Sequence, residues 1–240
     1  MRYLFPSAIN ENGWLIYLLF GEDAALSSKT YITFLALSFL LTVIVAYLLG
    51  SVNTAILISK RLYKSDVRES GSGNAGMTNM FRTYGKKAGF LTLTGDVLKA
   101  LVSVVLGFFL LGGPGQYIAG FFCLIGHVFP LYFGFKGGKG VIVSAITVLL
   151  IDPLIFLVLA VIFALMFLAT QIISASSITA AFFYPMVVYA FNRSAPNILY
   201  FLFSLMIAFF VIAMHKENIH RLLNRTEKKF TIHKDKKEKK

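Results

Sequence analysis

Long apolar runs alternate with short polar breaks along most of the chain, and this pattern predicts a bundle of membrane-spanning helices. A helix needs about 20 apolar residues to cross a bilayer. Seven candidate segments lie between the breaks: residues 31–59, 89–111, 117–135, 141–151, 153–169, 173–191 and 197–214. We therefore predict an all-α, polytopic membrane protein with about seven transmembrane helices.

Two short apolar segments do not fit a complete crossing. Residues 141–151 are too few to span a bilayer alone, so we expect a half-spanning or re-entrant helix and six or seven full crossings. Residues 1–30 form an N-terminal extension whose apolar stretch, 14–20, lacks the basic start and cleavage site of a signal peptide. We interpret this stretch as an interfacial helix, with Trp14 and Tyr17 at headgroup depth.

Basic residues gather in alternate loops, and this arrangement predicts the orientation of the helices. Residues 60–88 contain seven Lys or Arg, residues 135–140 two and residues 215–240 ten, whereas the loops at the other helix ends contain one. Cytoplasmic loops carry the excess of positive charge. We expect the N-terminus outside, a membrane domain over 31–214 and a basic cytoplasmic segment over 215–240. The net charge of +12 then reflects orientation, and no nucleic-acid partner is expected.

Two glycine-rich loops imitate nucleotide-binding motifs. Gly71, Gly73 and Gly76 match G-x-G-x-x-G, and Asp96 follows at the distance of a ribose-binding acid. A Rossmann turn follows a buried strand, whereas here a charged loop precedes the glycines and Asp96 lies in an apolar run. The stretch GFKGGKGV, 134–141, has neither the spacing nor the Ser or Thr of a Walker A loop. Both nucleotide-binding interpretations are rejected.

Four polar clusters nonetheless share the predicted cytoplasmic side. Glycines let backbone N–H groups approach an anion, and a neighbouring Lys or Arg adds fixed positive charge. The clusters consist of Gly71, Ser72, Gly73, Asn74, Gly76, Thr78, Asn79 and Arg82; Lys136, Gly137, Gly138 and Lys139; Ser174, Ser176 and Ser177; and His215 and Asn218. Together they predict a pocket for a small phosphorylated molecule that bears hydroxyl groups, without a metal or cofactor.

Three longer segments resemble the signature sequences of the PlsY family of bacterial acyl-phosphate:glycerol-3-phosphate acyltransferases. They are GSGNAGMTNMFR (71–82), GHVFPLYFGFKGGKGV (126–141) and HKENIHRLL (215–223), within a likeness that runs from about residue 31 to residue 224. The resemblance implies a seven-helix enzyme of the cell membrane with its active site on the cytoplasmic side. It also implies the reaction: the sn-1 hydroxyl of glycerol 3-phosphate attacks an acyl phosphate, giving lysophosphatidic acid and inorganic phosphate, the first acylation of phospholipid synthesis.

The resemblance, taken with the polar clusters, implies roles for individual residues. Catalysis falls to Arg82, Lys139 and His215. Substrate binding falls to Ser72, Asn74, Thr78, Asn79, Ser174 and Asn218, and phosphate binding by the backbone to Gly71, Gly73, Gly76, Gly137 and Gly138. The general base is either His215 or a substrate phosphate. The phosphate fits the sequence better, because the motifs contain no carboxylate–histidine pair and the acyl phosphate is already activated.

Some residues near the motifs have a second interpretation. Ser177 is an alternative to Ser174, because Gln171 stands where the family often has a basic residue. Lys136 is equally well explained as an interfacial anchor whose ammonium group reaches the headgroups. His127 is better explained as a packing residue.

Charged residues outside the motifs are interpreted as supporting or solvated groups. We expect Asp96 and Lys99 to pair and support the site, because an unpaired charge within a membrane span is costly. Glu227 and Lys228 are left outside the predicted site, because Arg225 stands where the family commonly has glycine.

The competing class is a membrane transporter for a small organic phosphate. Transporters also have basic loops and half-spans, but their binding groups lie near the bilayer midplane, between internal repeats. The chain has no internal repeat, and its polar clusters gather at one interface, which favours an enzyme whose acyl substrate lies in the leaflet. A lipid-binding scaffold is a third class, and it is disfavoured because such a protein would not need the two glycine-rich loops together. The expected partners are glycerol 3-phosphate, acyl phosphate and membrane lipids, while oligomeric state and acyl-chain preference do not follow from the sequence.

Overall fold

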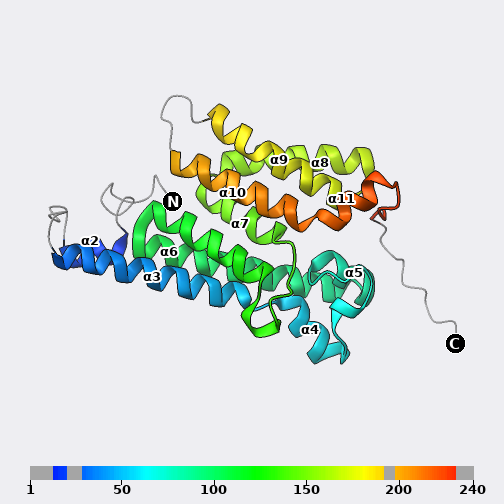
Figure 1. The fold of residues 1–240 in the computed structure, drawn as a ribbon, viewed down its shortest axis with the longest axis horizontal. Helices are drawn as coiled ribbons and strands as arrows, with labels where there is room; N and C mark the ends of the chain where they lie inside the picture. The colour runs from blue at the N-terminus through cyan, green and yellow to red at the C-terminus, as the bar shows by residue number, and fades with distance from the viewer. Residues whose placement is uncertain (1–12, 21–28, 192–197, 231–240) are drawn as a thin grey trace.

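The computed structural model describes residues 13–20, 29–191 and 198–230 (Figure 1). Within those ranges the chain forms α-helices and short 3-10 turns, and no strand, as the apolar pattern predicted. The helices are α2 (Trp14–Phe20), α3 (Lys29–Ser51), α4 (Thr54–Tyr63), α5 (Met77–Tyr84), α6 (Lys86–Val128), α7 (Val141–Ile151), α8 (Pro153–Thr170), α9 (Ile173–Phe191), α10 (Ile198–Met214) and α11 (Lys216–Leu223). The 3-10 turns are η1 (Val67–Glu69) and η2 (Leu131–Phe133).

The longest helix, α6, consists of two antiparallel arms joined at the GGPG sequence. Gly112 leaves the helical conformation, with φ 63° and ψ −146°. Lys99 Nζ lies 2.7 Å from His127 Nδ1, 28 residues further along the chain. A straight helix of that length would separate the two residues by about 42 Å, so the chain must reverse between them. The predicted span 89–111 corresponds to the first arm, and 117–135 to the second arm, which ends earlier than predicted, at Val128.

The first predicted span is divided. Helix α3 ends at Ser51, and α4 begins at Thr54 after a two-residue break. Asn53 is the N-cap of α4, and its side chain accepts a hydrogen bond from Ile56 N at 3.1 Å. Such a cap starts a new helix instead of continuing the previous one. The span expected over 31–59 therefore corresponds to α3 and the first part of α4, with an interruption between them that the apolar pattern did not predict, and α4 lies at one end of the molecule (Figure 1).

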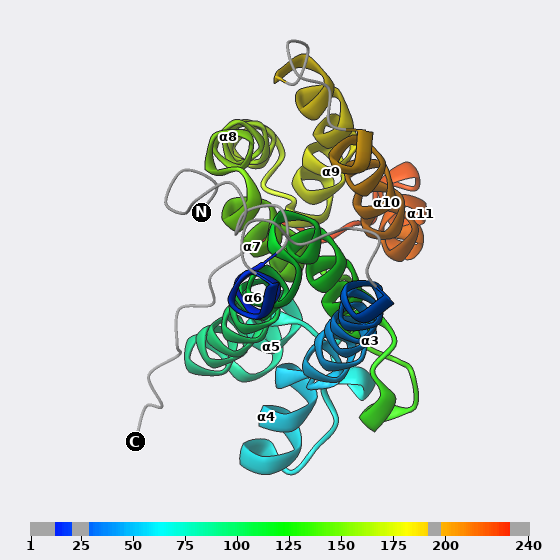
Figure 2. The same cartoon turned by 90° about the vertical axis from the view of Figure 1, so that its left-hand side faces the viewer.

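Helix α7 is short, as predicted. Its 11 residues make about 16 Å of helix, roughly half of a 30 Å hydrocarbon core. It lies between α6 and α8 and contacts both (Figure 2), with Val143 and Thr147 fully buried. Asp152 ends α7 and caps α8, accepting hydrogen bonds from Leu154 N and Ile155 N at 3.1 Å each.

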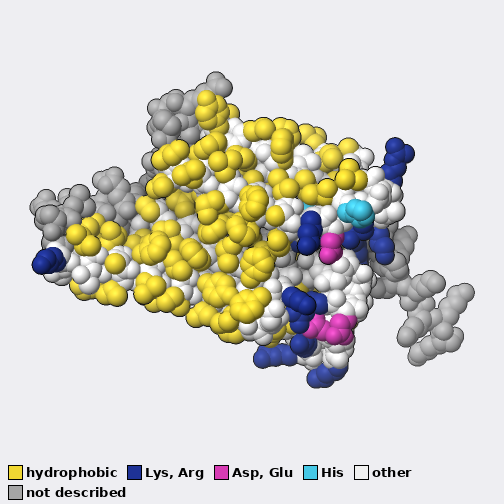
Figure 3. All heavy atoms as spheres, in the orientation of Figure 1, with side chains coloured by type: hydrophobic (Ala, Val, Ile, Leu, Met, Phe, Trp, Pro, Cys, Tyr) yellow, Lys and Arg dark blue, Asp and Glu magenta, His cyan; other side chains and the backbone are white. Residues whose placement is uncertain are grey.

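Apolar side chains cover the middle of the molecule, and charged side chains gather at one end, over α4, α5 and α11 (Figure 3). Helix α8 illustrates this, because Ile155 is the only one of its 18 residues that is buried. An apolar surface of this extent is suited to contact with lipid. Within the described residues, four helices are long and apolar enough to cross a membrane, or five if α10 and α11, bent by 60°, form one span. This count takes α3 and α4 together as one span and α6 as one helix, so the two arms of α6 add a crossing.

The two ends of the bundle differ. The basic loops lie together at the charged end, as expected of loops on one side of a membrane (Figure 3). Helix α2 lies at the opposite end, where Ile16 packs against Leu110 and Leu111 beside the bend in α6 (Figure 1). The cytoplasmic assignment of the charged end, the interfacial position of α2 and the boundaries at residues 30 and 214 stay predictions. Residues 1–12, 21–28, 192–197 and 231–240 lie outside the described residues.

Candidate active site

A cavity of about 950 Å³ opens at the charged end of the bundle, among α5, α7, α8, α9, α10 and α11. Its polar part is lined by Ser72, Asn74, Thr78, Asn79, Arg82, Lys139, Ser174, His215, Asn218, Arg221 and Glu227. Its apolar part lies among α7, α8, α9 and α10 and is lined by Val141, Ala145, Val148, Phe156, Leu159, Phe163, Tyr184, Ile207 and Val211. The four polar clusters of the sequence therefore meet at one cavity, which continues into an apolar space.

The first glycine-rich loop is organised around Asn79. Its side-chain oxygen accepts a hydrogen bond from Ser72 N at 2.9 Å, and its amide donates to the carbonyls of Val67 (3.0 Å) and Ser70 (2.9 Å). Gly71 has φ 64°, and a Cβ atom there would lie 2.2 Å from Asn79 Oδ1. Asn79 was predicted to bind substrate, but its hydrogen-bonding groups are used within the loop. It shapes the loop that carries Ser72.

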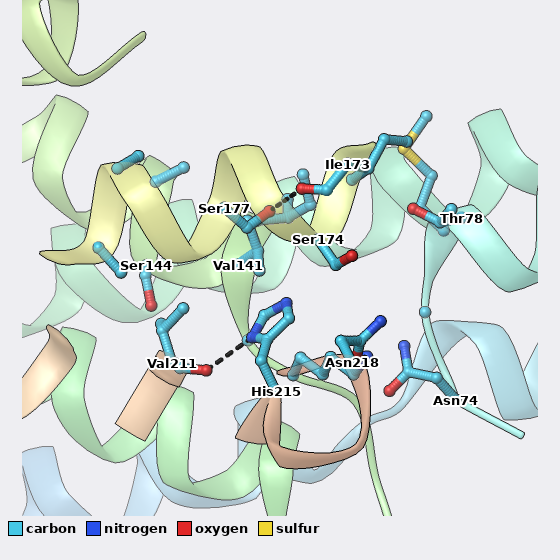
Figure 4. A pocket seen from close by; sticks show the side chains of 18 of the residues that line it. Asn74, Thr78, Val141, Ser144, Ile173, Ser174, Ser177, Val211, His215 and Asn218 are labelled. Carbon is cyan, nitrogen blue, oxygen red and sulfur yellow. Dashed lines mark hydrogen bonds between the residues drawn. The ribbon is translucent and has the colours of Figure 1, made fainter. Parts of the chain in front are cut away.

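Helix α5 presents its N-terminus and a cation to the polar part of the cavity. Gly76 is its N-cap, and the N–H groups at a helix start have no intrahelical partner and attract anions. Thr78 and Arg82 stand four residues apart, hence on one face, and both line the cavity. Asn74 faces the same space from the loop, across from Asn218 (Figure 4). This wall combines a hydroxyl, a guanidinium and a helix N-terminus.

The second glycine-rich loop binds the end of α6 instead of an anion. Gly137 N donates to the Val128 carbonyl at 3.0 Å, and Gly138 N donates to the His127 carbonyl at 3.1 Å. A Cβ atom on Gly138 would lie 2.3 Å from His127 Nε2, so the close approach requires glycine. The expectation that these two amides hold a phosphate is corrected: they anchor the loop, and the loop brings Lys139 to the cavity. Neither glycine lines the cavity, and nor does Gly73, whose N–H donates to Ser70.

Lys139 and Asn218 are in direct contact across the polar part of the cavity. Lys139 Nζ donates to Asn218 Oδ1, and Asn218 Nδ2 donates onward to Glu227 Oε1 at 2.7 Å. Burial, followed by the repulsion of Arg221, lowers the pKa of Lys139 to about 8. Lys139 is therefore mostly protonated at pH 7 and forms a cation that little water screens.

Glu227 lies at the centre of the polar network, although the sequence reasoning left it outside the site. Its Oε1 atom also accepts a hydrogen bond from Ser174 Oγ at 2.8 Å, and its Oε2 atom accepts one from Arg221 Nε at 2.6 Å. Burial opposes ionisation, but the hydrogen bonds from Arg221, Ser174 and Asn218 outweigh it and lower the pKa of Glu227 below its usual value. The carboxylate is therefore ionised at neutral pH.

The turn that carries Glu227 explains why it was missed. Arg225 stands where the family commonly has glycine, and this departure argued against a conserved geometry. In the structure Arg225 adopts φ 56°, the left-handed conformation that glycine favours. Arg225 thus takes a conformation that glycine adopts more readily, and the turn brings Glu227 to the cavity. Arg221 was also overlooked as a site residue, although it stands on α11 one turn after Asn218 and Glu217.

His215 faces the cavity as a neutral imidazole. It is 3% exposed, and its Nδ1 atom donates to the Val211 carbonyl at 2.6 Å (Figure 4). Burial lowers its pKa to about 4, against the opposing effect of the Val211 carbonyl. Because Nδ1 carries the proton, the opposite nitrogen, Nε2, is left as an acceptor at the cavity. Of the two candidate serines, Ser174 points its hydroxyl into the polar network, whereas Ser177 donates to its own helix at Ile173, 2.9 Å away.

Comparison with known proteins identifies the family. The sequence model described as glycerol-3-phosphate acyltransferase matches residues 40–225, more than half of the chain. The chain belongs to this family. It is 41% identical over 196 residues to a glycerol-3-phosphate acyltransferase of Streptococcus thermophilus (strain CNRZ 1066), covering 78% of this chain and 91% of that protein. It is 38% identical over 189 residues to one of Bacillus subtilis (strain 168), covering 79% and 96%.

Two crystal structures of PlsY, described as an integral membrane glycerol 3-phosphate acyltransferase, share the fold. The glycerol 3-phosphate form superposes with a TM-score of 0.75 and 34% identity, covering 81% of this chain and 96% of that one. The lysophosphatidic acid form gives a TM-score of 0.72 and 32% identity, with the same coverage. This chain is thus a multi-pass membrane acyltransferase, and the resemblance noted in its motifs is confirmed.

A buried ionic network borders the cavity, because Asp96 and His127 are among its lining residues. Lys99 Nζ lies 2.9 Å from Asp96 Oδ1 and donates to the Val52 carbonyl at 3.0 Å, in addition to its contact with His127. The expected pairing of Asp96 with Lys99 is therefore confirmed. His127 joins the network and also supports Gly138, which explains its place at the end of an apolar run.

The remaining basic candidate, Lys136, lies outside the main cavity of the acyltransferase. It borders a shallow surface depression beside Asp66 and Arg68, and its carbonyl accepts a hydrogen bond from Arg68 at 3.1 Å. This position agrees with the interfacial-anchor interpretation. Among residues 13–20, 29–191 and 198–230, no group of three or more His, Cys, Asp and Glu is placed to hold a metal ion.

Proposed function

We propose that the protein transfers an acyl group from an acyl phosphate to the sn-1 hydroxyl of glycerol 3-phosphate, forming lysophosphatidic acid and inorganic phosphate. The observation that carries the proposal is one cavity whose cationic, hydroxyl-rich part continues into an apolar part. A water-soluble phosphate ester and a lipid acyl chain can meet in such a cavity, each in surroundings of its own polarity. The printed names of the relatives support the same reaction.

The polar part provides the phosphate contacts. Arg82 and Lys139 supply charge, while Ser72, Thr78 and the start of α5 supply hydrogen-bond donors. A hydrogen bond between ionised partners contributes about 1.5–3 kcal/mol, so two or three such bonds are enough to set substrate affinity. The same cations face the phosphate that leaves the acyl donor, and they stabilise the negative charge that develops on the carbonyl oxygen.

The apolar part provides room for the acyl chain. Ten residues of α9 separate Ser174 from Tyr184, which corresponds to about 15 Å along the helix. Val148, Phe156 and Ile207 line the same cavity from α7, α8 and α10. An acyl chain that enters from the leaflet therefore places its carbonyl next to His215 and Lys139, where the polar part begins.

A substrate phosphate accepts the proton of the attacking hydroxyl. The pKa of His215, about 4, makes it a weaker base than a phosphate monoester, whose second pKa is about 6. His215 Nδ1 donates to the backbone carbonyl of Val211, so this proton is not directed to a carboxylate. His215 instead lines the cavity where its polar and apolar parts meet and helps to position the glycerol backbone. The hydroxyl oxygen forms the ester bond, the bond between the carbonyl carbon and phosphate oxygen breaks, and inorganic phosphate leaves with that electron pair.

The active site faces the cytoplasm of the cell membrane. The basic loops that surround the cavity support this orientation, since cytoplasmic loops carry the excess of positive charge (Figure 3). The partners of the enzyme are accordingly glycerol 3-phosphate from the cytosol, and acyl phosphate and lipids of the inner leaflet.

The test is an assay of detergent-purified protein with labelled glycerol 3-phosphate, offered palmitoyl phosphate or palmitoyl-CoA in parallel. We expect lysophosphatidic acid from the acyl phosphate alone, and its loss in Arg82→Ala and Lys139→Ala. Lys87→Ala, an exposed position on α6, is the matched control and should retain activity. Product from palmitoyl-CoA alone would contradict the assignment of acyl phosphate as the acyl donor. If neither donor gives product while glycerol 3-phosphate still binds, the result would favour a transporter of a small organic phosphate.

A further inference from the structure

A serine hydroxyl stands at the start of the apolar part of the cavity. Ser144 follows Val141 by one turn on α7, and both line the cavity, as does Val148 one turn deeper. Three residues of helix rise about 4.5 Å, so Ser144 lies just past the level of Val141. Figure 4 shows its oxygen directed toward the side of the cavity where Val211 and His215 lie. The hydroxyl is therefore placed where a lipid substrate would pass from the polar to the apolar part.

The Ser144 hydroxyl has no hydrogen-bond partner among residues 13–20, 29–191 and 198–230, although the residue is only 7% exposed. A hydroxyl within a helix commonly donates to the carbonyl four residues earlier. Thr147, on the next turn of α7, does so, with its Oγ1 atom 2.8 Å from the Val143 carbonyl, and it does not line the cavity. A buried hydroxyl without a partner lowers stability, so a donor left free at the cavity points to a ligand.

The acyl donor supplies a hydrogen-bond acceptor at this level. Its phosphate belongs with the cations Arg82 and Lys139, and its alkyl chain belongs in the apolar part, beside Val148 and Phe156. The carbonyl group joins the phosphate to the chain, so it lies where the two parts of the cavity meet. Because the methylene groups beyond it accept no hydrogen bond, the carbonyl oxygen is the acceptor that the Ser144 hydroxyl can reach from the apolar side.

We propose that Ser144 is a further catalytic residue, which donates a hydrogen bond to the carbonyl oxygen of the acyl phosphate. This inference rests on the proposed function. When the hydroxyl of glycerol 3-phosphate attacks, the carbonyl carbon becomes tetrahedral, and its oxygen takes up the electron pair of the carbonyl π bond until the bond to phosphate breaks. A donor that is already in place in apolar surroundings stabilises this negative charge. Ser144 thus acts on the oxygen from the apolar side, and Lys139 from the polar side.

The first experiment measures kcat with palmitoyl phosphate, together with thermal unfolding in detergent, for the wild type, Ser144→Ala and Ser51→Ala. Ser51 is the matched control, because its hydroxyl is also buried without a partner in the described part of the chain but does not line the cavity. We expect Ser144→Ala to lower kcat by about tenfold or more, because a donor to the developing oxyanion is lost. Its unfolding temperature should be unchanged or higher, since an unpaired buried hydroxyl is removed.

Ser51→Ala should show the same effect on stability and keep the wild-type kcat. A wild-type kcat in Ser144→Ala overturns the proposal. A loss of activity that accompanies a lower unfolding temperature overturns it as well, because it shows that Ser144 serves the packing of α7.

A second experiment tests the contact with the carbonyl by binding alone. The probe 2-oxoheptadecylphosphonate keeps the carbonyl of palmitoyl phosphate and has a methylene group in place of the bridging oxygen, whereas heptadecylphosphonate lacks the carbonyl. We expect the preference for the first probe, measured as the ratio of the two dissociation constants, to fall about fivefold from the wild type to Ser144→Ala. Ser51→Ala should keep the wild-type ratio. An unchanged ratio in Ser144→Ala assigns the carbonyl to another donor and overturns the proposal.

Two further outcomes are distinguishable from these. Should Ser144→Ala fail to fold, Ser144→Cys replaces the hydroxyl with a thiol, which is a weaker donor, and it too must lower kcat and the ratio. A wild type that forms no lysophosphatidic acid contradicts the proposed function, while the two phosphonates still test the contact between Ser144 and a carbonyl oxygen.

Discussion

Ser174 Oγ donates a hydrogen bond to Glu227 Oε1 across 2.8 Å, although 53 residues separate the two in the chain. The contact joins the start of α9 to the turn after α11, and it closes the polar part of the cavity on one side. Because Asn218 shares the same carboxylate oxygen and also contacts Lys139, the four side chains form one connected network. Such networks respond as a unit when one member is changed.

Arg82 should not be replaceable by lysine. Arg82→Lys keeps the charge but loses the planar, forked set of donors that matches a phosphate. We expect kcat/KM for glycerol 3-phosphate to fall about tenfold, the equivalent of one weakened charge-assisted hydrogen bond. Steady-state kinetics of Arg61→Lys, at an exposed position on α4, serve as the control and should match the wild type. Equal activity of Arg82→Lys and wild type would show that Arg82 acts only as a point charge.

Activity should decline as the pH rises through about 8. Lys139 must be protonated to bind phosphate, and burial lowers its pKa to about 8, so the free enzyme loses this cation above that pH. We expect the decline in kcat/KM, because this parameter reports ionisations of the free enzyme. It should disappear in Lys139→Arg, because arginine stays charged throughout this range. A pH profile of Lys139→Arg that retains the decline would assign it to another group.

Removing Lys99 alone should destabilise the protein more than removing Lys99 and Asp96 together. Lys99→Met leaves the Asp96 carboxylate buried without its partner, at a cost of about 3–5 kcal/mol. The pair Asp96→Asn with Lys99→Met removes both charges. Thermal unfolding in detergent measures the stability of the wild type, the single variant and the double variant. Lys87→Met, on the exposed start of α6, is the control. A double variant less stable than Lys99→Met would contradict the account.

Loosening the segment that carries Glu227 should affect one substrate selectively. Phe230→Ala removes the ring that packs near Phe81 and Phe167, so the carboxylate is no longer held from the side of α8. We expect the KM for glycerol 3-phosphate to rise severalfold while the KM for palmitoyl phosphate changes little. Phe209→Ala, at a ring 67% exposed on α10, is the control. Equal effects on both KM values would indicate a general disturbance of the cavity.

Much of the fold followed from local features of the sequence. The lengths of the apolar runs predicted a helical membrane protein, and the break between residues 111 and 117 predicted the two arms of α6. The half-length helix α7 was recognisable because a predominantly apolar run of 11 residues cannot cross a bilayer. The break at Asn53 was missed, because an N-cap within an apolar run produces no drop in hydropathy and is recognised only from its hydrogen bond to Ile56.

The sequence by itself determined which chemical groups the active site contains, since Arg82, Lys139, Ser174, His215 and Asn218 belong to recognisable polar clusters that line one cavity. Only the tertiary structure decided how these groups are used. It assigned the amides of Gly137 and Gly138 to the end of α6 and the side chain of Asn79 to its own loop. It also brought Glu227 into the network through a left-handed turn at Arg225, a conformation that residue type alone does not predict. Residue types and run lengths are properties of the chain, whereas hydrogen-bond partners depend on which distant segments the packing brings within about 3 Å.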